Sequence, residues 1–374
     1  MKALLKEYDL GRSVFCSVVC TDSTDTKLRN RGLRTIRYHD GQAVISDAAK
    51  SYTVQENNRA FFESLNEYDV VEISEGGVVR SVLDTASGDA VLFITSKCNS
   101  NCLMCPSGNY SRKTGNIPSL PYFMEMVRYY PSDLEHITIT GGEPFLIGKD
   151  AFALLQYLKR HIGEAEYLIL TNGRIFCLDH YVSQLAETAP VHTTLAIPLH
   201  GSTAESHDRI TQSKGSFDQT ISGISKLLAA DMAIEIRIVV SKLNVHDLEN
   251  IAKLIAEKFP NTYRVHLIGL EMLGNAAVNR KDVWLPYEEA FAQSKAAIDL
   301  LVNAGISTAL YNFPLCAVEE EYHLLCKKSI SDYKQQYPEA CLVCAKRELC
   351  GGIFAGSKRF AEKDLKPFIE ESND

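Results

Sequence analysis

Short apolar runs alternate with turn residues through the first 88 positions of the chain. The runs cover 14–19, 33–38, 43–45 and 70–73, and glycine, aspartate and serine separate them, as in Ser74-Glu-Gly-Gly77. Runs of this length between turn residues are typical of β-strands. We therefore predict a small β-rich domain over residues 1–88.

From residue 89 the pattern changes to alternating strands and helices. Strands are predicted over 91–95, 136–140, 167–171, 192–199, 233–241 and 263–270, and helices over 119–130, 150–161, 217–230, 245–259 and 287–304. Alternation of this kind indicates parallel strands joined by right-handed helical crossovers. We therefore predict an α/β fold, a partial (βα)6 TIM-like barrel, over residues 89–305.

The remaining segment, 306–374, loses this rhythm and is rich in cysteine. It holds five cysteines and ends in an acidic tail, Phe368-Ile-Glu-Glu-Ser-Asn-Asp374. We predict a third, cysteine-rich domain over 306–374.

Composition narrows the class of protein. The chain has 374 residues, of which 45% are hydrophobic, and its net charge is 39 − 47 = −8. A mildly acidic chain is a poor candidate for non-specific binding to nucleic acid or a membrane surface. The sequence lacks a signal-peptide pattern and any run of about 18 apolar residues, so we expect a cytoplasmic protein. Eleven cysteines in such a chain favour metal or redox chemistry over disulfides.

Three of these cysteines form the most specific motif. They read Cys98-Asn-Ser-Asn-Cys102-Leu-Met-Cys105 and follow the first strand of the predicted barrel. Three thiolates on one loop can hold three irons of a [4Fe–4S] cluster and leave the fourth iron open. An open metal position is a chemical site, as it is in catalytic zinc enzymes. The spacing differs from the paired C-x2-C units of zinc knuckles.

A second motif, Gly141-Gly142-Glu143-Pro144, follows the next predicted strand. Two glycines let the backbone turn tightly and approach a ligand closely. Glu143 adds a carboxylate suited to an ammonium group. Because active-site groups gather at the carboxyl ends of barrel strands, we expect this motif and the cysteine loop to share one site.

Residues from about 91 to 290 resemble the core domain of the radical SAM superfamily. In that family S-adenosylmethionine (SAM) chelates the open iron and is cleaved to a 5′-deoxyadenosyl radical. The resemblance implies that Cys98, Cys102 and Cys105 ligate the cluster. It implies SAM contacts at a further set of positions, namely Met104, Gly141, Gly142, Glu143, Asn172 and Arg237.

Two positions depart from the family pattern. Met104 stands where an aromatic residue near adenine is usual, and Pro198 stands where a small hydroxyl residue is usual. Gly201-Ser202 is the nearest substitute for that missing hydroxyl.

The C-terminal cysteines form a second group, Cys341-x2-Cys344-x5-Cys350-Gly351-Gly352. Cys316 is a candidate fourth ligand, and Cys326 is either a spare buried thiol or a competitor of Cys316 for that position. Four thiolates would saturate either a [4Fe–4S] cluster or a zinc ion, and ligand type favours iron–sulfur. The spacing resembles the auxiliary-cluster domains of peptide-modifying radical SAM enzymes, and one auxiliary cluster is implied.

Several segments together resemble the His-Xaa-Ser system radical SAM maturases. They are the cysteine loop, Leu199-His-Gly-Ser-Thr-Ala204, Asn312-x-Pro-Leu-Cys316, Ile330-Ser-Asp-Tyr-Lys334 and the C-terminal cysteine group. The resemblance implies a ribosomally made peptide as substrate, a sibling radical SAM protein as partner, and an electron donor such as flavodoxin or ferredoxin. Substrate-side acid and base residues stay unassigned.

Two other functions remain open on the sequence. One is a radical SAM enzyme that acts on a small molecule or on tRNA, although the net charge disfavours RNA. The other is a non-catalytic scaffold that holds zinc or a cluster and binds a partner protein.

Overall fold

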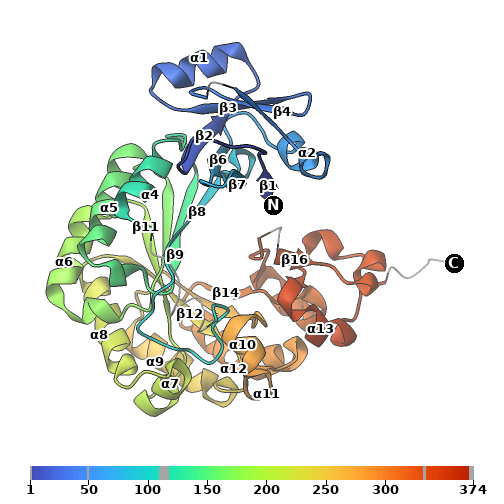
Figure 1. Cartoon of the computed structure of the whole chain (residues 1–374). Helices are drawn as coiled ribbons and strands as arrows, with labels where there is room; N and C mark the ends of the chain where they lie inside the picture. Colours follow the sequence, from blue (N-terminus) through green and yellow to red (C-terminus); the bar gives the residue numbers. More distant parts are fainter. Residues whose placement is uncertain (1, 49, 109–117, 332–333, 370–374) are drawn as a thin grey trace.

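The computed structural model describes residues 2–48, 50–108, 118–331 and 334–369 and contains two large β-sheets (Figure 1). Two sequence predictions fall partly outside these residues. They are the end of the acidic tail, 370–374, and positions 332–333 of the Ile330–Lys334 segment.

The N-terminal sheet has seven strands in the order β1-β7-β6-β2-β3-β4-β5. Their bounds are β1 Lys2–Leu4, β2 Val14–Val18, β3 Thr35–His39, β4 Gln42–Ile45, β5 Ser51–Thr53, β6 Val70–Ile73 and β7 Val78–Leu83. Leu5 and Val54 form an isolated bridge just beyond β1 and β5, so the two edges of the sheet meet. A closed sheet of this kind leaves little open edge for another strand.

All four strands predicted in this region are present, as β2, β3, β4 and β6. Helices α1, Asp22–Asn30, and α2, Glu56–Glu63, were not predicted. The pattern gave no signal for α1 because only Thr24 and Leu28 of its residues are buried. The sheet encloses its own apolar cluster, which includes the buried Cys16 and Tyr52.

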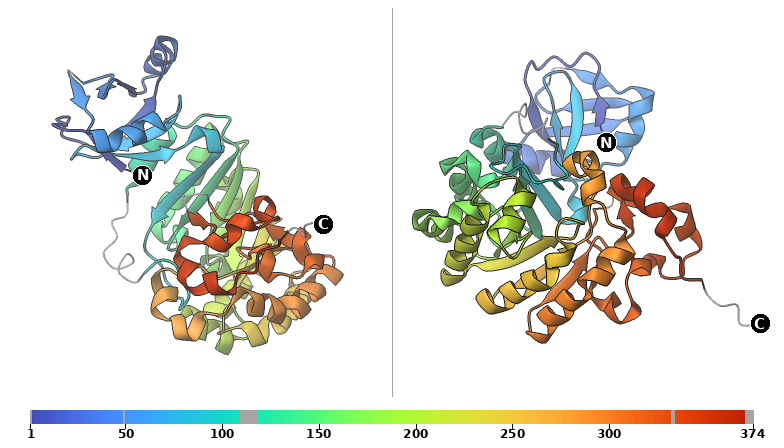
Figure 2. Two further views of the ribbon diagram at one scale, coloured as in Figure 1. Left: turned by 90° about the vertical axis from the view of Figure 1, so that its right-hand side faces the viewer. Right: turned by 90° about the horizontal axis from the view of Figure 1, so that it is seen from below.

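The second sheet has eight parallel strands in the order β15-β14-β13-β12-β11-β10-β9-β8. The bounds are β8 Asp89–Thr95, β9 His136–Gly141, β10 Glu166–Leu170, β11 Thr193–Pro198, β12 Ala233–Val239, β13 Arg264–Ile268, β14 Thr308–Tyr311 and β15 Cys326–Lys327. The α/β prediction is confirmed: the curved parallel sheet has helices along its outer side (Figures 1 and 2).

Helices connect most of these strands, with two in succession between β11 and β12 and three between β13 and β14, and one more follows near the C-terminus. They are α4 Leu120–Val127, α5 Lys149–His161, α6 Asp179–Thr188, α7 Ala204–Thr211, α8 Ser216–Ala229, α9 Leu248–Lys258, α10 Gly274–Val278, α11 Arg280–Val283, α12 Tyr287–Asn303 and α13 Lys358–Ala361. No described helix is long and apolar enough to cross a membrane.

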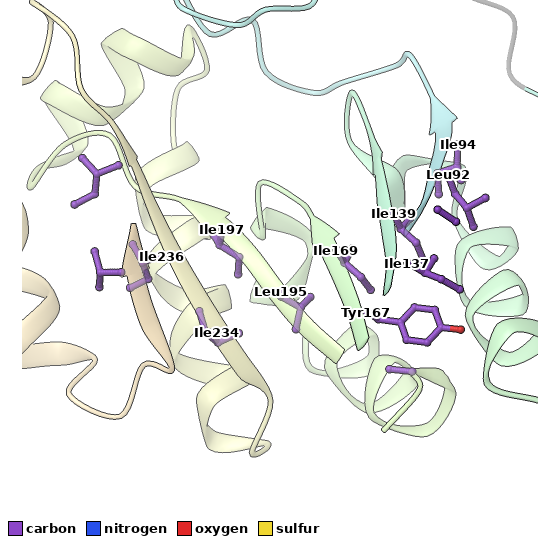
Figure 3. Close-up of a cluster of buried hydrophobic side chains, with 14 of the residues drawn as sticks. Leu92, Ile94, Ile137, Ile139, Tyr167, Ile169, Leu195, Ile197, Ile234 and Ile236 are labelled. Atoms are coloured by element: carbon purple, nitrogen blue, oxygen red, sulfur yellow. The ribbon is translucent and has the colours of Figure 1, made fainter. Parts of the chain in front are cut away.

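One row of side chains shows why this sheet forms in one register (Figure 3). Leu92, Ile139, Ile169, Leu195 and Ile234 are register partners across five successive strands. Each is at most 2% exposed. Burying such a side chain contributes roughly 1.5–3 kcal/mol, and a slip by one residue would turn the whole row to the other face.

The sheet continues beyond the six predicted strands. β14 pairs in parallel with β13, and β15 pairs with β14, so residues after 305 extend the core sheet. These strands were missed because they have only four and two residues, too few for a period to appear. A short antiparallel pair, β16 Gln335–Gln336 and β17 Ile353–Phe354, lies further along.

Candidate functional site

The cysteine loop begins directly after β8, at the carboxyl edge of the parallel sheet. Cys98, Cys102 and Cys105 are all half-buried. The Ser100 N–H points to the Cys98 sulfur at 3.4 Å, and the Cys105 N–H donates to the Cys102 carbonyl at 3.2 Å. An N–H directed at sulfur favours the thiolate that a cluster ligand requires.

Helix α7 holds one side of this loop by its backbone. The Asn101 N–H donates to the Thr211 carbonyl at 2.9 Å, and the Leu103 N–H donates to the Ile210 carbonyl at 3.0 Å. Both acceptors lie in the last turn of α7, where carbonyls lack partners within the helix. The loop therefore satisfies the end of the helix while the helix fixes the loop.

Two asparagines near α10 hold the other side. Asn275 donates its backbone N–H to the Cys105 carbonyl at 2.9 Å and its side-chain nitrogen to the Cys102 carbonyl at 3.0 Å. Asn279 donates its side-chain nitrogen to the Leu103 carbonyl at 2.9 Å. These contacts orient the segment from 102 to 105.

The two glycines after β9 are required by close packing against the same loop. A Cβ on Gly141 would lie 2.3 Å from the Thr95 carbonyl oxygen, and a Cβ on Gly142 would lie 2.2 Å from that of Lys97. The Gly142 N–H donates to Thr95 and the Glu143 N–H donates to Lys97, both at 2.7 Å. The sequence indicated a close approach to a ligand, whereas the structure shows a close approach to the chain itself.

Glu143 is buried, and its carboxylate joins two strand ends. It accepts hydrogen bonds from the Phe145 N–H at 3.1 Å, the Thr171 hydroxyl at 2.8 Å and the Asn172 N–H at 2.7 Å. Burial raises the pKa of Glu143, and these hydrogen bonds offset part of that rise. The predicted contact of Glu143 with the SAM ammonium stays a prediction, but its carboxylate already has an internal structural role.

Asn172 and Arg174 connect the end of β10 to the cysteine loop. The Asn172 side chain donates to the Asn99 side chain at 2.6 Å. One nitrogen of Arg174 donates to the Asn99 carbonyl at 2.8 Å and to the Ser100 and Ser213 hydroxyls at 2.9 Å. Arg174 is only 9% exposed, so its guanidinium group contacts the loop and not solvent.

Sequence reasoning missed Arg174, Asn275 and Asn279. The Arg174 contacts to Asn99 and Ser100 span about 75 positions, and those of the two asparagines span more than 170. No local spacing encodes contacts of that length. Only the topology that brings the strand ends together identifies them.

Met104 points into the protein. It is 4% exposed and belongs to a buried apolar cluster with Ile210, Leu270 and Met272. The expectation that residue 104 lies near adenine therefore applies to its backbone, because its side chain is occupied in packing. Ser202 is likewise engaged: its hydroxyl and its N–H both donate to Asp247, at 2.6 and 2.7 Å, so it is no ready substitute for the missing hydroxyl.

Arg237 belongs to an ionic network on β12 and β13. Its Nε lies 2.5 Å from Glu235, which also accepts from Arg264 at 2.7 Å and has the His266 ring nitrogen at 3.1 Å. Burial by itself raises the pKa of Glu235, but the nearby His266 ring and the Arg237 charge outweigh it and lower the pKa to about 2. The terminal nitrogens of Arg237 have no other partner among the described residues, so a SAM carboxylate contact stays a prediction.

The C-terminal cysteines meet in one pocket of about 400 Å³, part of it open to solvent. Cys316, Cys341, Cys344 and Cys350 all line it. Burial raises the pKa of Cys341 to about 11, and the neighbouring thiolate charges of the other three add to this rise. A bound cation would reverse that effect, since metals bind thiolates.

Cys326 does not line this pocket; it lies on β15, where it is a register partner of Leu310. Burial raises the pKa of this thiol to about 12. Of the two cysteines that the sequence left open as fourth ligand, the structure therefore groups Cys316 with the other three.

Two backbone donors support this pocket. The N–H groups of Leu315 and Gly352 point to the Cys350 sulfur at 3.4 and 3.3 Å. Within the described ranges, no three His, Cys, Asp or Glu side chains converge as the ligands of a single metal ion would. The fit of both cysteine groups to clusters therefore rests on their donor sets, three and four thiols, and on these N–H groups directed at sulfur.

Residues 92–255 match the sequence model of the family described as the radical SAM superfamily. This range includes the cysteine loop, the Gly-Gly-Glu turn, Asn172 and Arg237. The matched range lies within the part of the chain for which the sequence analysis predicted a radical SAM core.

Two curated relatives match about half of their own length. The AdoMet-dependent heme synthase of Methanosarcina barkeri is 26% identical over 180 residues, 47% of this chain and 49% of the relative. The mycofactocin maturase MftC of Mycobacterium tuberculosis is 27% identical over 213 residues, 57% of this chain and 51% of the relative.

Among solved structures, SuiB of Streptococcus suis bound to the precursor peptide SuiA is similar in fold. The match has a TM-score of 0.50 at 15% identity and covers 59% of this chain and 48% of that one.

Replacing Gly142 should loosen the cysteine loop. Gly142→Ala places a methyl group against the Lys97 backbone, which has no flexible end to move away. We expect the free energy of unfolding to fall by about 1–3 kcal/mol, measured by urea titration, together with loss of iron from this loop. Gly76→Ala is the control, because its Cβ would meet nothing within 4 Å. Equal behaviour of the two variants would contradict the packing constraint.

Arg174→Lys tests the hydrogen bonds by which Arg174 holds the cysteine loop. The change keeps the charge but loses the planar fork that reaches several acceptors. We expect the affinity of the cysteine loop for iron, measured after anaerobic reconstitution, to fall about tenfold with the fold intact, since supporting contacts typically cost that much. Arg160→Lys is the control, because Arg160 is exposed and donates to the Gln156 carbonyl in its own helix. An unchanged iron affinity would show that the Arg174 contacts are dispensable.

The Glu235 network predicts a dependence of stability on pH. The pKa of the Glu235 carboxyl is lowered from 4.5 to about 2. The stability that the ionised carboxylate gives the folded protein is therefore fully present above pH 4.5 and is lost as the pH falls through about 2. Glu235→Gln should cost about 3 kcal/mol at pH 7 by urea titration, and the cost should shrink on acidification. Asp22→Asn, on a side chain that is 94% exposed, should change little at any pH. A constant cost from pH 7 to 3 would refute the linkage.

Proposed function

We propose that this protein is a radical SAM enzyme that cleaves SAM reductively and modifies a ribosomally synthesised peptide. The observation that carries the proposal is the cysteine loop, with three thiols held at the carboxyl edge of the parallel sheet against the Gly-Gly-Glu turn. A [4Fe–4S] cluster with one open iron, when bound there, supplies the electron that splits SAM into methionine and a 5′-deoxyadenosyl radical.

Different residues of the chain would hold the cluster and the separate parts of SAM. Cys98, Cys102 and Cys105 would hold the cluster, and the backbone around Gly141 and Gly142 would border the amino end of SAM. Arg237 would offer its terminal guanidinium nitrogens to the SAM carboxylate. Asn172 would contact the sugar or methionine part while it keeps Asn99 in place. The curved sheet would exclude water, so that the radical meets only the intended C–H bond.

A peptide substrate is supported by the names of two similar proteins. MftC is a maturase of mycofactocin, and SuiB has been seen with its precursor peptide. The Cys316, Cys341, Cys344 and Cys350 pocket would hold an auxiliary [4Fe–4S] cluster, with zinc as the alternative. A sibling radical SAM protein and a flavodoxin or ferredoxin as electron donor complete the proposal.

A small molecule is the second candidate substrate. The observation that favours it is the similarity to the AdoMet-dependent heme synthase, at nearly the same identity as to MftC. Any short peptide encoded beside this gene would be incubated with the protein and its mass measured. A mass change of the peptide during SAM cleavage supports peptide maturation, and SAM cleavage with no change in the peptide supports a small-molecule substrate.

Cysteine substitutions test the two metal groups separately. After anaerobic reconstitution with iron and sulfide, we expect about eight irons per chain and deoxyadenosine formation under dithionite, since each cluster holds four. Cys98→Ala should abolish cleavage, because its thiolate is one of only three. Cys344→Ala should keep the first cluster and lower the iron to about four.

Cys20→Ala is the matched control, because Cys20 is exposed and outside both groups. Retained cleavage in Cys98→Ala would overturn the mechanism. Unchanged iron in Cys344→Ala would refute the auxiliary site. No cluster in the unaltered protein would favour the non-catalytic scaffold.

A further inference from the structure

The last described segment of the chain, residues 365–368, borders the C-terminal cysteine pocket; we call it the C-terminal strap. Leu365, Pro367 and Phe368 line the pocket together with the four cysteines. Leu365 also packs against the main apolar core, which attaches the strap at its beginning. The strap is thus a wall of the pocket rather than a free end.

Phe368 is fixed from both its backbone and its ring. Its carbonyl accepts a hydrogen bond from the Ala345 N–H at 2.7 Å, next to Cys344. The Lys346 ammonium lies 4.5 Å from the centre of its ring, and the His323 ring meets it edge-on at 5.8 Å. A half-buried aromatic ring held in this way covers the pocket beside Cys344.

Lys366 contributes through its backbone and its side chain separately. Its backbone N–H lies close enough to Cys316 to counter part of the rise that burial causes in the pKa of that thiol. Its ammonium pairs with Glu288 of α12, with nitrogen–oxygen distances of 2.7 and 2.9 Å. The side-chain ion pair is exposed and contributes little by itself. The backbone donor is the contact that bears on the metal ligand.

Hydrogen bonds to ligand sulfurs and exclusion of solvent are the two means by which a protein sets the affinity and potential of a cluster. Cys350 receives such bonds from the N–H groups of Leu315 and Gly352, whereas the N–H group that acts on Cys316 is that of Lys366 in the strap. Cys316 is also the ligand most remote in sequence from the other three. It therefore depends most on a contact of this kind.

We propose that the C-terminal strap is an integral part of the C-terminal metal site. The Lys366 N–H positions Cys316 as the fourth thiolate ligand, and Phe368 shields the bound metal from water and oxygen. Lys366 and Phe368 are positioning residues, not ligands. This inference rests on the proposed function, which places a cluster or zinc in this pocket.

The first test separates the backbone donor of Lys366 from its side chain. The protein carries Cys98→Ala, Cys102→Ala and Cys105→Ala, so that all bound metal belongs to the C-terminal site. Lys366→Pro deletes the N–H, and Lys366→Ala deletes only the ion pair. Because residue 366 precedes Pro367, it is already confined to extended conformations that proline can share.

In that background, metal release to an excess of the chelator EDTA is followed anaerobically by metal analysis. We expect Lys366→Pro to lose metal about tenfold faster than the parent, and Lys366→Ala to stay within about twofold. If the metal is an iron–sulfur cluster, Lys366→Pro should also shift its reduction equilibrium about tenfold toward the oxidised form, about 59 mV for one electron. Equal release by all three proteins would overturn the role of the N–H.

The second test addresses the shield. Phe368→Ala should hasten metal loss in air about tenfold, while Phe368→Leu should restore most of the protection because it refills the volume with apolar atoms. Equal loss from both variants and the parent would overturn the shielding. If the parent protein binds no metal in the C-terminal site, both the proposed metal site and the role of the strap are refuted. If the parent binds metal and every strap variant loses it at the same rate as the parent, only the role of the strap is refuted.

Discussion

A contact between two stretches of backbone sets the geometry of the site. The chain leaves β9 through Gly141 and Gly142, whose α-carbons approach the carbonyls of Thr95 and Lys97 too closely for any side chain. Two short hydrogen bonds accompany the contact. Because Lys97 directly precedes Cys98, the start of the cysteine loop is fixed by the end of the neighbouring strand. The Gly-Gly-Glu turn and the cluster loop are therefore one structural unit.

The other strand ends extend this unit along the sheet. Glu143 continues it to β10 through Thr171 and Asn172, and Arg174 returns from the turn after β10 to hold the cysteine loop. The buried Glu143 carboxylate and Arg174 guanidinium are costly in isolation, and their hydrogen bonds offset that cost. A site so connected favours one arrangement of the loop over many, which is what a cofactor with several simultaneous contacts requires.

The C-terminal site follows a different plan. It lies beside the short β16–β17 pair instead of the parallel sheet, and its cysteines lie on or directly after short 3-10 turns, including Leu315–Ala317 and Glu339–Val343. Its order comes from side-chain and backbone contacts between segments distant in sequence: the turn at Cys316, the group at 341–350 and the strap at 365–368. Such a site gains much of its stability from the metal itself, because metal binding and local folding are coupled.

The sequence by itself determined the classes of element and the candidate chemistry. Hydrophobic periodicity identified the six long core strands, because each buries one face over at least five residues, and local spacing identified both cysteine groups. It failed for α1, β14 and β15, which are too polar or too short to show a period.

The tertiary structure alone decided which distant groups meet. It brought Cys316 rather than Cys326 to the C-terminal pocket, turned Met104 into the core, assigned the glycines to backbone packing, and revealed Arg174, Asn275 and Asn279 as supports of the loop. The physical reason is range: periodicity and motif spacing report interactions within a few turns of chain, whereas these contacts arise only when parallel strands align their ends.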